Sequence, residues 1–221
     1  MLQGVIFDLD GVIVDSHPAH QRAWRKFFDS LGKEVSDDQL LFVLEGRKRE
    51  DILRHFLGDL TPEQVRYYGE RKETFFRHSS GAVKAIPGIS DLLEDLRVAN
   101  VPAAVASSAS RVRVESMLAQ LGLVSQFRAI VAADDVVHGK PDPSIFNLAA
   151  QMLNVEPRSV LVCEDSVFGV VAAKTAGMKC LGIAANGRRA ILTNAGADWV
   201  LPHFSSVRVA HLQRLFPTDN G

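Results

Sequence analysis

Residues 5–11, with the sequence Val5-Ile6-Phe7-Asp8-Leu9-Asp10-Gly11, decide the fold of this chain. The apolar run at 5–7 has the character of a buried strand, and the acids and glycine that follow it indicate a loop. Side chains alternate along a strand, so Asp8 and Asp10 are predicted to share one face, with Cα atoms roughly 7 Å apart. Leu9 then points away from them into the core. The stretch therefore predicts a buried strand that ends in two carboxylates.

The rest of the chain alternates similar runs with helical patterns. Apolar residues at helical spacing predict helices over 89–98, 114–121 and 145–153. Strands that alternate with helices indicate a parallel sheet with helices on both faces. The predicted fold class is therefore α/β, a Rossmann-like open parallel sheet flanked by helices. Its further strands are expected at the apolar runs 103–106, 129–132, 160–163 and 180–183.

Residues 15–80 interrupt this alternation. A helix is predicted over 17–31, with Pro18 in its first turn. The segments 36–39 and 61–64, Ser-Asp-Asp-Gln and Thr-Pro-Glu-Gln, match the capping box that opens a helix. No convincing strand pattern occurs here. We therefore expect an inserted all-helical cap domain at 15–80, between core segments 1–14 and 81–221.

Polar and charged side chains follow the predicted strands. Open parallel sheets bind ligands at the carboxyl ends of their strands, so these groups should converge on one edge. Several carboxylates in one place repel one another unless a cation neutralises them. Mg²⁺ prefers oxygen ligands and commonly keeps several waters, and a substrate phosphate would complete its shell. The candidate ligands are Asp8, Asp165 and Glu164; the neighbouring groups are Asp10, Ser107, Ser108, Lys140, and Asp134 and Asp135, for which helix capping or a loop role is the better interpretation.

Composition argues against several other classes of protein. The chain of 221 residues carries 25 basic and 26 acidic side chains, a formal net charge of −1, whereas nucleic-acid binding needs a basic surface. The cluster at 47–49, Arg-Lys-Arg, is either a local anion site or a solvated face. Signal-peptide features and membrane-length apolar runs are absent from the sequence. We expect a cytoplasmic enzyme, a monomer or weak dimer, that acts on a small-molecule phosphate ester and not on nucleic acid or membrane. Cys163 and Cys180 are expected to be buried, reduced thiols.

The ordered motifs resemble those of the haloacid dehalogenase superfamily. Residues 7–16 are similar to its first motif, Ser107 to its second, Lys140 within 139–143 to its third, and 164–169 to its fourth. The position of the insert matches the subfamily with a small helical cap, and the second acid, Asp10, is similar to that of the phosphotransferase branch. This resemblance implies that Asp8 attacks phosphorus to form an aspartyl phosphate and that Asp10 is the general acid and base. It further implies Ser107 as a phosphoryl contact, Lys140 as charge stabiliser, and Mg²⁺ held by Asp8, the Asp10 carbonyl, Glu164 and Asp165.

The cap is similar to that of the beta-phosphoglucomutase-like subfamily. Residues 20–24, His-Gln-Arg-Ala-Trp, resemble a stretch of its first cap helix, and residues 46–51 resemble its substrate-facing loop. The resemblance implies an arginine grip on a distal phosphate and a histidine that helps to gate proton transfer. The chain departs from the subfamily pattern at Glu45, Arg47 and Lys48. The substrate-binding candidates are His20, Trp24, Gly46, Arg49, Lys72, Ser107 and Ser108, of which His20, Trp24 and Arg49 are also explained by ordinary packing or surface exposure.

Three functions from different classes follow. The first is a Mg²⁺-dependent phosphatase of a small phosphorylated metabolite, such as a sugar phosphate, and the second is a phosphoglucomutase-like isomerase that uses the same residues. The third is a non-enzymatic phosphoacceptor or binding protein. Phosphoacceptor domains carry their acidic pair on the first strand and the acceptor later, and they are about half this length, so motif order argues against the third.

Overall fold

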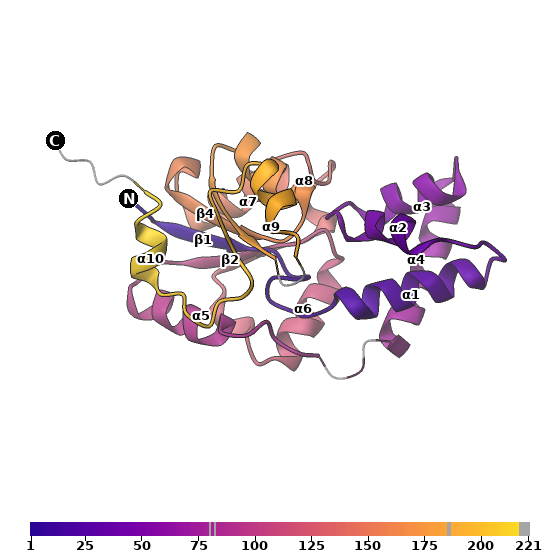
Figure 1. Ribbon diagram of the computed structural model, residues 1–221, viewed down its shortest axis with the longest axis horizontal. Helices are drawn as coiled ribbons and strands as arrows, with labels where there is room; N and C mark the ends of the chain where they lie inside the picture. Colours follow the sequence, from indigo (N-terminus) through magenta and orange to yellow (C-terminus); the bar gives the residue numbers. More distant parts are fainter. Residues whose placement is uncertain (80, 82, 185–186, 217–221) are drawn as a thin grey trace.

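The computed structural model describes residues 1–79, 81, 83–184 and 187–216. Its centre is a single sheet in which every neighbouring pair of strands is parallel (Figure 1). The six strands are β1 (Gly4–Phe7), β2 (Ala103–Ala106), β3 (Ala129–Val131), β4 (Val160–Glu164), β5 (Lys179–Ile183) and β6 (Trp199–Leu201). They lie in the order β3-β2-β1-β4-β5-β6. The predicted open parallel sheet is confirmed, and the short strand β6 was not predicted.

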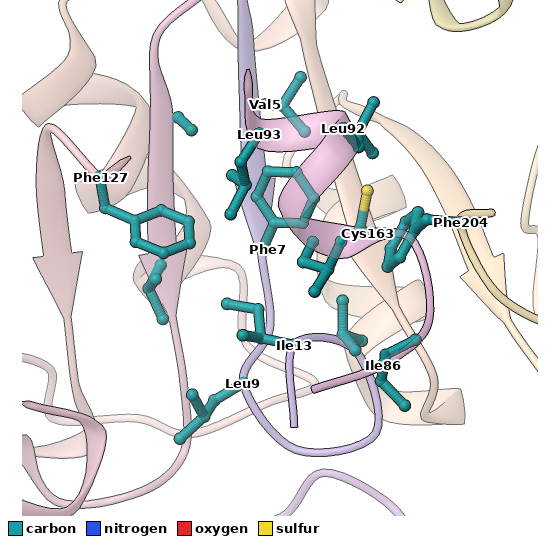
Figure 2. Packing of buried hydrophobic residues seen from close by; sticks show 14 of the residues in the cluster. Val5, Phe7, Leu9, Ile13, Ile86, Leu92, Leu93, Phe127, Cys163 and Phe204 are labelled. Atoms are coloured by element: carbon teal, nitrogen blue, oxygen red, sulfur yellow. The ribbon is translucent and has the colours of Figure 1, made fainter. Parts of the chain in front are cut away.

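Strand β1 lies between β2 and β4, and all of its residues are buried. Its side chains alternate between the two faces of the sheet, as the sequence predicts. Val5 and Phe7, followed by Leu9, pack in one core that includes Leu92 and Leu93 (Figure 2), whereas Ile6 packs in the core on the opposite face. A fully apolar strand in this position fixes where its carboxyl end, and therefore Asp8, must lie.

Helices cover both faces of the sheet (Figure 1). One face packs against α5 (Ile89–Val98), α6 (Arg111–Gln120) and α10 (Val209–Gln213). The other packs against α7 (Ser144–Leu153), α8 (Val167–Thr175) and α9 (Arg189–Asn194). Helix α6 begins before the predicted residue 114, because Ser110 is its N-cap. Within the described part of the chain, short 3₁₀ helices occur at Phe42–Leu44, Val124–Gln126, Ala133–Asp135 and Pro157–Ser159.

The predicted helical insert is present. Its helices are α1 (His17–Asp29), α2 (Asp37–Leu41), α3 (Arg49–Leu57) and α4 (Pro62–Ser79), and residues 17–79, all described, contain no strand. Both predicted capping boxes form: Gln39 N and Gln64 N donate to the hydroxyls of Ser36 and Thr61, each at 3.3 Å. The insert has its own core, rich in aromatic rings, which includes Trp24.

Two backbone hydrogen bonds between antiparallel segments join the insert to the sheet domain. The backbone N–H of Asp15 donates to the Lys84 carbonyl, and that of Ile86 donates to the Ile13 carbonyl, each at 2.9 Å. The chain therefore leaves and re-enters the core at one place. Ser80, the predicted end of the insert, lies outside the described residues, so the boundaries 15–80 remain a prediction.

Two further expectations concern the chain as a whole. Cys163 and Cys180 are buried, free thiols, as predicted. Among the helices of the described residues, none combines the length and the apolar character required to cross a bilayer.

Candidate active site

Asp8 lies directly after β1 and contacts a buried lysine. Lys140 Nζ lies 2.6 Å from Asp8 Oδ1 and 2.5 Å from Glu164 Oε1, and the Lys140 side chain has no exposed surface. The structure thus brings together three charged groups that are distant in sequence. Burial alone would lower the pKa of Lys140, but the two carboxylates outweigh it and raise that pKa. The lysine is held in its ammonium form beside the Asp8 carboxylate.

The charges around Asp8 do not balance. Burial raises the pKa of Asp8 to about 8 against the attraction of Lys140, and the carboxylates of Glu164, Asp165 and Asp10 add to the rise. One ammonium therefore faces an excess of negative charge at this edge of the sheet. A carboxylate in such surroundings gains from any further cation that approaches it.

Glu164 uses both carboxylate oxygens within the protein. Oε1 contacts Lys140, and Oε2 accepts hydrogen bonds from Asp165 N at 2.7 Å, Ser166 N at 2.8 Å and Ser166 Oγ at 2.9 Å. Gly169 in α8 is necessary for this arrangement, because a Cβ there would strike the Glu164 carboxylate. Glu164, a predicted Mg²⁺ ligand, therefore fastens the loop after β4 to Lys140 through both of its carboxylate oxygens.

Asp10 is held by donors from the core and from the cap. Ser16 Oγ donates to its Oδ1 at 2.5 Å, His20 Nε2 lies 3.3 Å from the same oxygen, and Arg113 in α6 pairs with Oδ2. Burial alone would raise the pKa of Asp10, but Arg113, His20 and Ser16 hold it well below its usual range. Asp10 is consequently an ionised base in this arrangement.

Asp165 pairs with a histidine at the start of the cap. His17 Nε2 lies 2.7 Å from Asp165 Oδ2, yet this buried oxygen receives no properly directed hydrogen bond from the described residues. Burial alone would lower the pKa of His17, but Asp165 and then Asp10 raise it to about 9. Gly11, with φ +76°, is required beside this pair because a Cβ would strike Asp165 Oδ2. Asp165 Oδ2 thus faces the His17 imidazole and accepts no other donor among the described residues.

The serines after β2 have different surroundings. Ser107 is buried, and its Oγ accepts a hydrogen bond from Ala109 N at 3.2 Å, which leaves its own hydroxyl proton available. Ser108 Oγ donates to the carbonyl of Gly46 in the cap at 2.7 Å. Gly46 has φ +82°, and a Cβ there would strike Ser166 Oγ. Ser108 and Gly46, both predicted to bind substrate, therefore form a contact between core and cap.

His20 and Lys72 connect the cap to Asp10. Lys72 Nζ lies 3.1 Å from His20 Nδ1, and both side chains are buried. Burial, and then Lys72, lower the pKa of His20 to about 3, and burial with Arg113 lowers the pKa of Lys72 to about 7. A lysine ammonium has only donors, so neutral His20 accepts at Nδ1 and donates from Nε2 to Asp10.

Two other predicted cap residues differ in exposure. Trp24 is 1% exposed and stacks on Phe28 with ring centroids 5.5 Å apart, so most of its surface belongs to the cap core. The Arg49 side chain is 40% exposed, and its Nη1 lies 3.8 Å from Glu73 Oε2 in α4. Glu45, a potential partner of Arg49 on sequence spacing, pairs instead with Arg47 at 3.5 Å.

These side chains surround one cavity of about 240 Å³ between the core and the cap. Asp134 also lines it, but its Oδ2 accepts the backbone N–H of Arg111 at 2.6 Å, the capping role that was preferred for it. Every predicted substrate-binding or catalytic residue except Lys140 lines the cavity, as does the metal candidate Asp165. Lys140 lies behind Asp8 as its buried partner.

Sequence reasoning missed two residues of this site, His17 and Arg113. Each forms an ion pair with a predicted residue, Asp165 and Asp10 respectively. The position of His17 one residue after Ser16 of the first motif was a usable signal. No signal in the sequence pointed to Arg113, because its contact with Asp10 spans 103 positions of the chain.

The donor set suits a hard divalent cation. Asp8 and Asp165 are the carboxylates with raised pKa, and the buried Asp165 Oδ2 has His17 at 2.7 Å but no well-directed hydrogen bond from the described residues. Among the residues that the structure describes, no cluster of three or more His, Cys, Asp or Glu side chains forms a complete metal site. Mg²⁺ does not need one, since it commonly uses one or two carboxylates together with waters and substrate phosphate.

The fold and this arrangement of acids and lysine are those of a capped α/β hydrolase. Residues 5–183 match the haloacid dehalogenase-like hydrolase family. The chain is 31% identical over 220 residues to validoxylamine A 7'-phosphate phosphatase of Streptomyces hygroscopicus subsp. limoneus, covering 96% of this chain and 99% of that one. It is 34% identical over 192 residues to fructose-1-phosphate phosphatase of Escherichia coli (strain K12), covering 81% and 95%.

A solved structure supports the same relationship. The crystal structure of beta-phosphoglucomutase from Clostridium difficile superposes with a TM-score of 0.83 at 27% identity, covering 97% of each chain. The chain therefore belongs to the haloacid dehalogenase-like hydrolase family. The predicted family, the α/β fold with a helical cap and the assignment as a phosphatase-type enzyme are confirmed.

Proposed function

We propose that this protein is a Mg²⁺-dependent phosphatase of a small phosphorylated sugar or similar metabolite. The observation that carries the proposal is the Asp8 carboxylate, held by Lys140 at 2.6 Å at the floor of the cavity. A buried carboxylate with a fixed ammonium beside it is suited to attack phosphorus, because the lysine offsets the charge that develops on the transferring group.

In the proposed reaction, Asp8 forms a bond to phosphorus while the ester bond to the leaving alcohol breaks. The product of this step is a phosphoryl group on Asp8 and a free alcohol. Asp10, once it carries a proton, gives that proton to the leaving oxygen and later removes one from the attacking water. Hydrolysis of the aspartyl phosphate then releases inorganic phosphate and restores Asp8.

Ser107 is proposed to hold a phosphoryl oxygen. Its Oγ already accepts the N–H of Ala109, so its own proton is free to donate to the substrate. A neutral donor fixed in a buried position contributes to orientation, because its geometry does not need to reorganise during transfer.

For Mg²⁺, the proposed protein ligands are Asp8, Asp165 and the backbone carbonyl of Asp10. When bound, the ion would neutralise phosphate charge and help to orient the transferring group. Glu164 is proposed to position Lys140 and the loop after β4, since both of its oxygens already have protein partners. This role differs from the direct ligation that the family resemblance implied.

The size and lining of the cavity support a small, polar substrate. Its volume of about 240 Å³ lies below the roughly 300–1,000 Å³ of common ligand pockets. Two relatives are named as phosphatases of validoxylamine A 7'-phosphate and fructose 1-phosphate, which supports a sugar phosphate or a comparable molecule. Arg49 and Lys72 add positive charge to the cap side of this cavity.

A mutase reaction is the second candidate. The contacts His20–Asp10 and Lys72–His20 favour it, because they link the predicted acid/base to the cap, and a named beta-phosphoglucomutase shares the fold. In that reaction a sugar hydroxyl, in place of water, would receive the phosphoryl group from Asp8.

The test is a phosphate-release screen over sugar and polyol phosphates, with conversion of glucose 1-phosphate to glucose 6-phosphate measured in parallel. We expect release of phosphate that stops in excess chelator and returns with Mg²⁺. Asp8→Asn should lose turnover by more than about 10³-fold with an unchanged circular dichroism spectrum. Isomerisation without net phosphate release would favour the mutase, and turnover by folded Asp8→Asn protein would refute both.

A further inference from the structure

The three cations of the basic cluster at 47–49 all line the cavity, but their side chains have separate partners within the protein. Arg49 pairs with Glu73 inside the cap, whereas Arg47 lies over the rings of Phe42 in the cap and Phe168 in the core, at 4.3 and 3.9 Å. Lys48 extends in a third direction, onto a core loop. These three neighbouring cations therefore have separate partners, and two of them join the cap to the core.

Lys48 makes two hydrogen bonds across the domain boundary. Its Nζ donates to the carbonyl of Val136 at 2.6 Å and to the carbonyl of Val137 at 3.0 Å. Both carbonyls belong to the loop that leads to Lys140. The side chain of Val137 is 85% exposed, so it does little to anchor this loop in the core. Charged donors make stronger hydrogen bonds to carbonyls than neutral donors do.

The aliphatic part of Lys48 covers the residue next to Lys140. A Cβ built on Gly139 would lie 2.5 Å from Lys48 Cγ and 3.1 Å from Cδ. Lys48 thus spans the loop from Val136 to Gly139, and the following residue is the lysine that contacts Asp8. The absence of a side chain at Gly139 leaves the space that the lysine stem occupies.

Helix stability does not account for a lysine at this position. Lys48 is the N-cap of α3 and makes no side-chain cap hydrogen bond. A cation at a helix N-terminus is disfavoured by the helix dipole, whereas Glu50 and Asp51 in the first turn are favoured. The contacts of Lys48 with the core are the interactions that offset this disadvantage.

We propose that Lys48 is a positioning residue, which holds the loop 136–139 when the cap is closed and thereby keeps Lys140 in place on Asp8. The inference rests on the proposed function, since it assigns Lys140 a part in phosphoryl transfer. It connects the cap to the reaction without any contact between Lys48 and the reacting atoms. Cap closure then assembles the charge arrangement around Asp8 as well as enclosing the substrate.

The test compares Lys48→Met with Lys33→Met. Lys33 is the matched control, because its Nζ donates to the Phe56 carbonyl at 2.5 Å entirely within the cap. Each variant is assayed in Mg²⁺ with a small aryl phosphate and with the best sugar phosphate from the screen. We expect Lys48→Met to lower kcat by roughly 10- to 100-fold on both substrates with little change in KM. Lys48→Arg, which keeps the positive charge, should recover most of the lost kcat. Lys33→Met should retain the kcat of the wild type.

A second measurement does not depend on activity. Hydrogen exchange followed by mass spectrometry should show faster exchange over residues 136–142 in Lys48→Met than in the wild type or Lys33→Met. If no substrate is turned over, the proposed function fails, but exchange still decides whether Lys48 holds this loop. Thermal unfolding of each variant shows whether a loss of kcat comes with a loss of overall stability or is confined to the active site.

A steric variant tests the same contact from the core side. Gly139→Ala should lower kcat in the wild-type background and have a smaller effect in Lys48→Ala, because the atoms that its Cβ would strike are then absent. An equal effect of Gly139→Ala in both backgrounds would overturn the proposal. So would unchanged kcat and exchange in Lys48→Met, or a rise in KM confined to the sugar phosphate, which would make Lys48 a substrate-binding residue.

Discussion

Replacing Glu164 by glutamine distinguishes two roles of this residue, because they predict opposite changes in the stability of the metal-free protein. If Glu164 were a metal ligand, removal of its charge would relieve repulsion among neighbouring carboxylates and stabilise the metal-free protein. The observed contacts predict destabilisation instead. The glutamine amide has one oxygen and one NH₂ group, whereas the site presents donors on both sides: Lys140 on one, and the loop N–H and O–H groups of Asp165 and Ser166 on the other.

The magnitude follows from burial. Glu164 is 0% exposed, and removing one partner of a buried ion pair typically costs about 3–5 kcal/mol. Lys140 keeps its contact with Asp8 in the variant, so we expect the lower end, about 3 kcal/mol. With a urea slope of about 2–3 kcal/mol/M, the midpoint of unfolding should fall by about 1–1.5 M.

The assay is urea unfolding in excess chelator at pH 7, with Asp165→Asn as the neighbouring control. Burial raises the pKa of Asp165, and its partner His17 can lose its proton when the charge of Asp165 is removed, so this substitution should cost less than Glu164→Gln. The half-saturating Mg²⁺ concentration for turnover should rise strongly in Asp165→Asn and much less in Glu164→Gln. A metal-free Glu164→Gln protein as stable as the wild type, with greatly weakened Mg²⁺ activation, would refute the positioning role.

Three further predictions concern Asp10 and the cap. Asp10→Asn should slow alkyl phosphates by at least 10-fold more than an aryl phosphate, whose leaving oxygen needs no proton; equal losses in kcat/KM would contradict the acid role. Arg113→Met should be less stable than the wild type at pH 7, because Arg113 helps to keep the pKa of Asp10 below its unfolded value. The lowered pKa of Asp10 stabilises the folded protein at pH values above the unfolded pKa, near 3.8, and this stabilisation is lost as the pH falls further. The urea midpoints of Arg113→Met and the wild type should therefore converge below about pH 4. Arg49→Ala should lower kcat/KM by roughly 2–4 kcal/mol for a substrate with a second anionic group and far less for an aryl phosphate. Glu73→Gln, which frees Arg49 from its partner at 3.8 Å, should not lower it, and equal small effects on both substrates would exclude an anion grip.

Local sequence determined the elements that depend on near neighbours. The run at 5–7 and the acids after it predicted β1 and the position of Asp8, because strand periodicity and burial operate over a few residues. The capping boxes at 36–39 and 61–64 likewise predicted two helix starts, since their hydrogen bonds close within three residues. The order of the strand-end residues predicted which groups would meet at the carboxyl edge of the sheet.

Tertiary structure alone decided how those groups are partnered. The contact of Arg113 with Asp10, that of His17 with Asp165 and that of Lys48 with the loop before Lys140 join segments far apart in the chain. Neither hydrophobic periodicity nor motif spacing encodes such contacts, because they depend on how segments distant in sequence lie relative to one another after the chain has packed. For the same reason, the sequence could place Glu164 at the site, whereas only the packed structure shows that both of its carboxylate oxygens already accept hydrogen bonds from the protein.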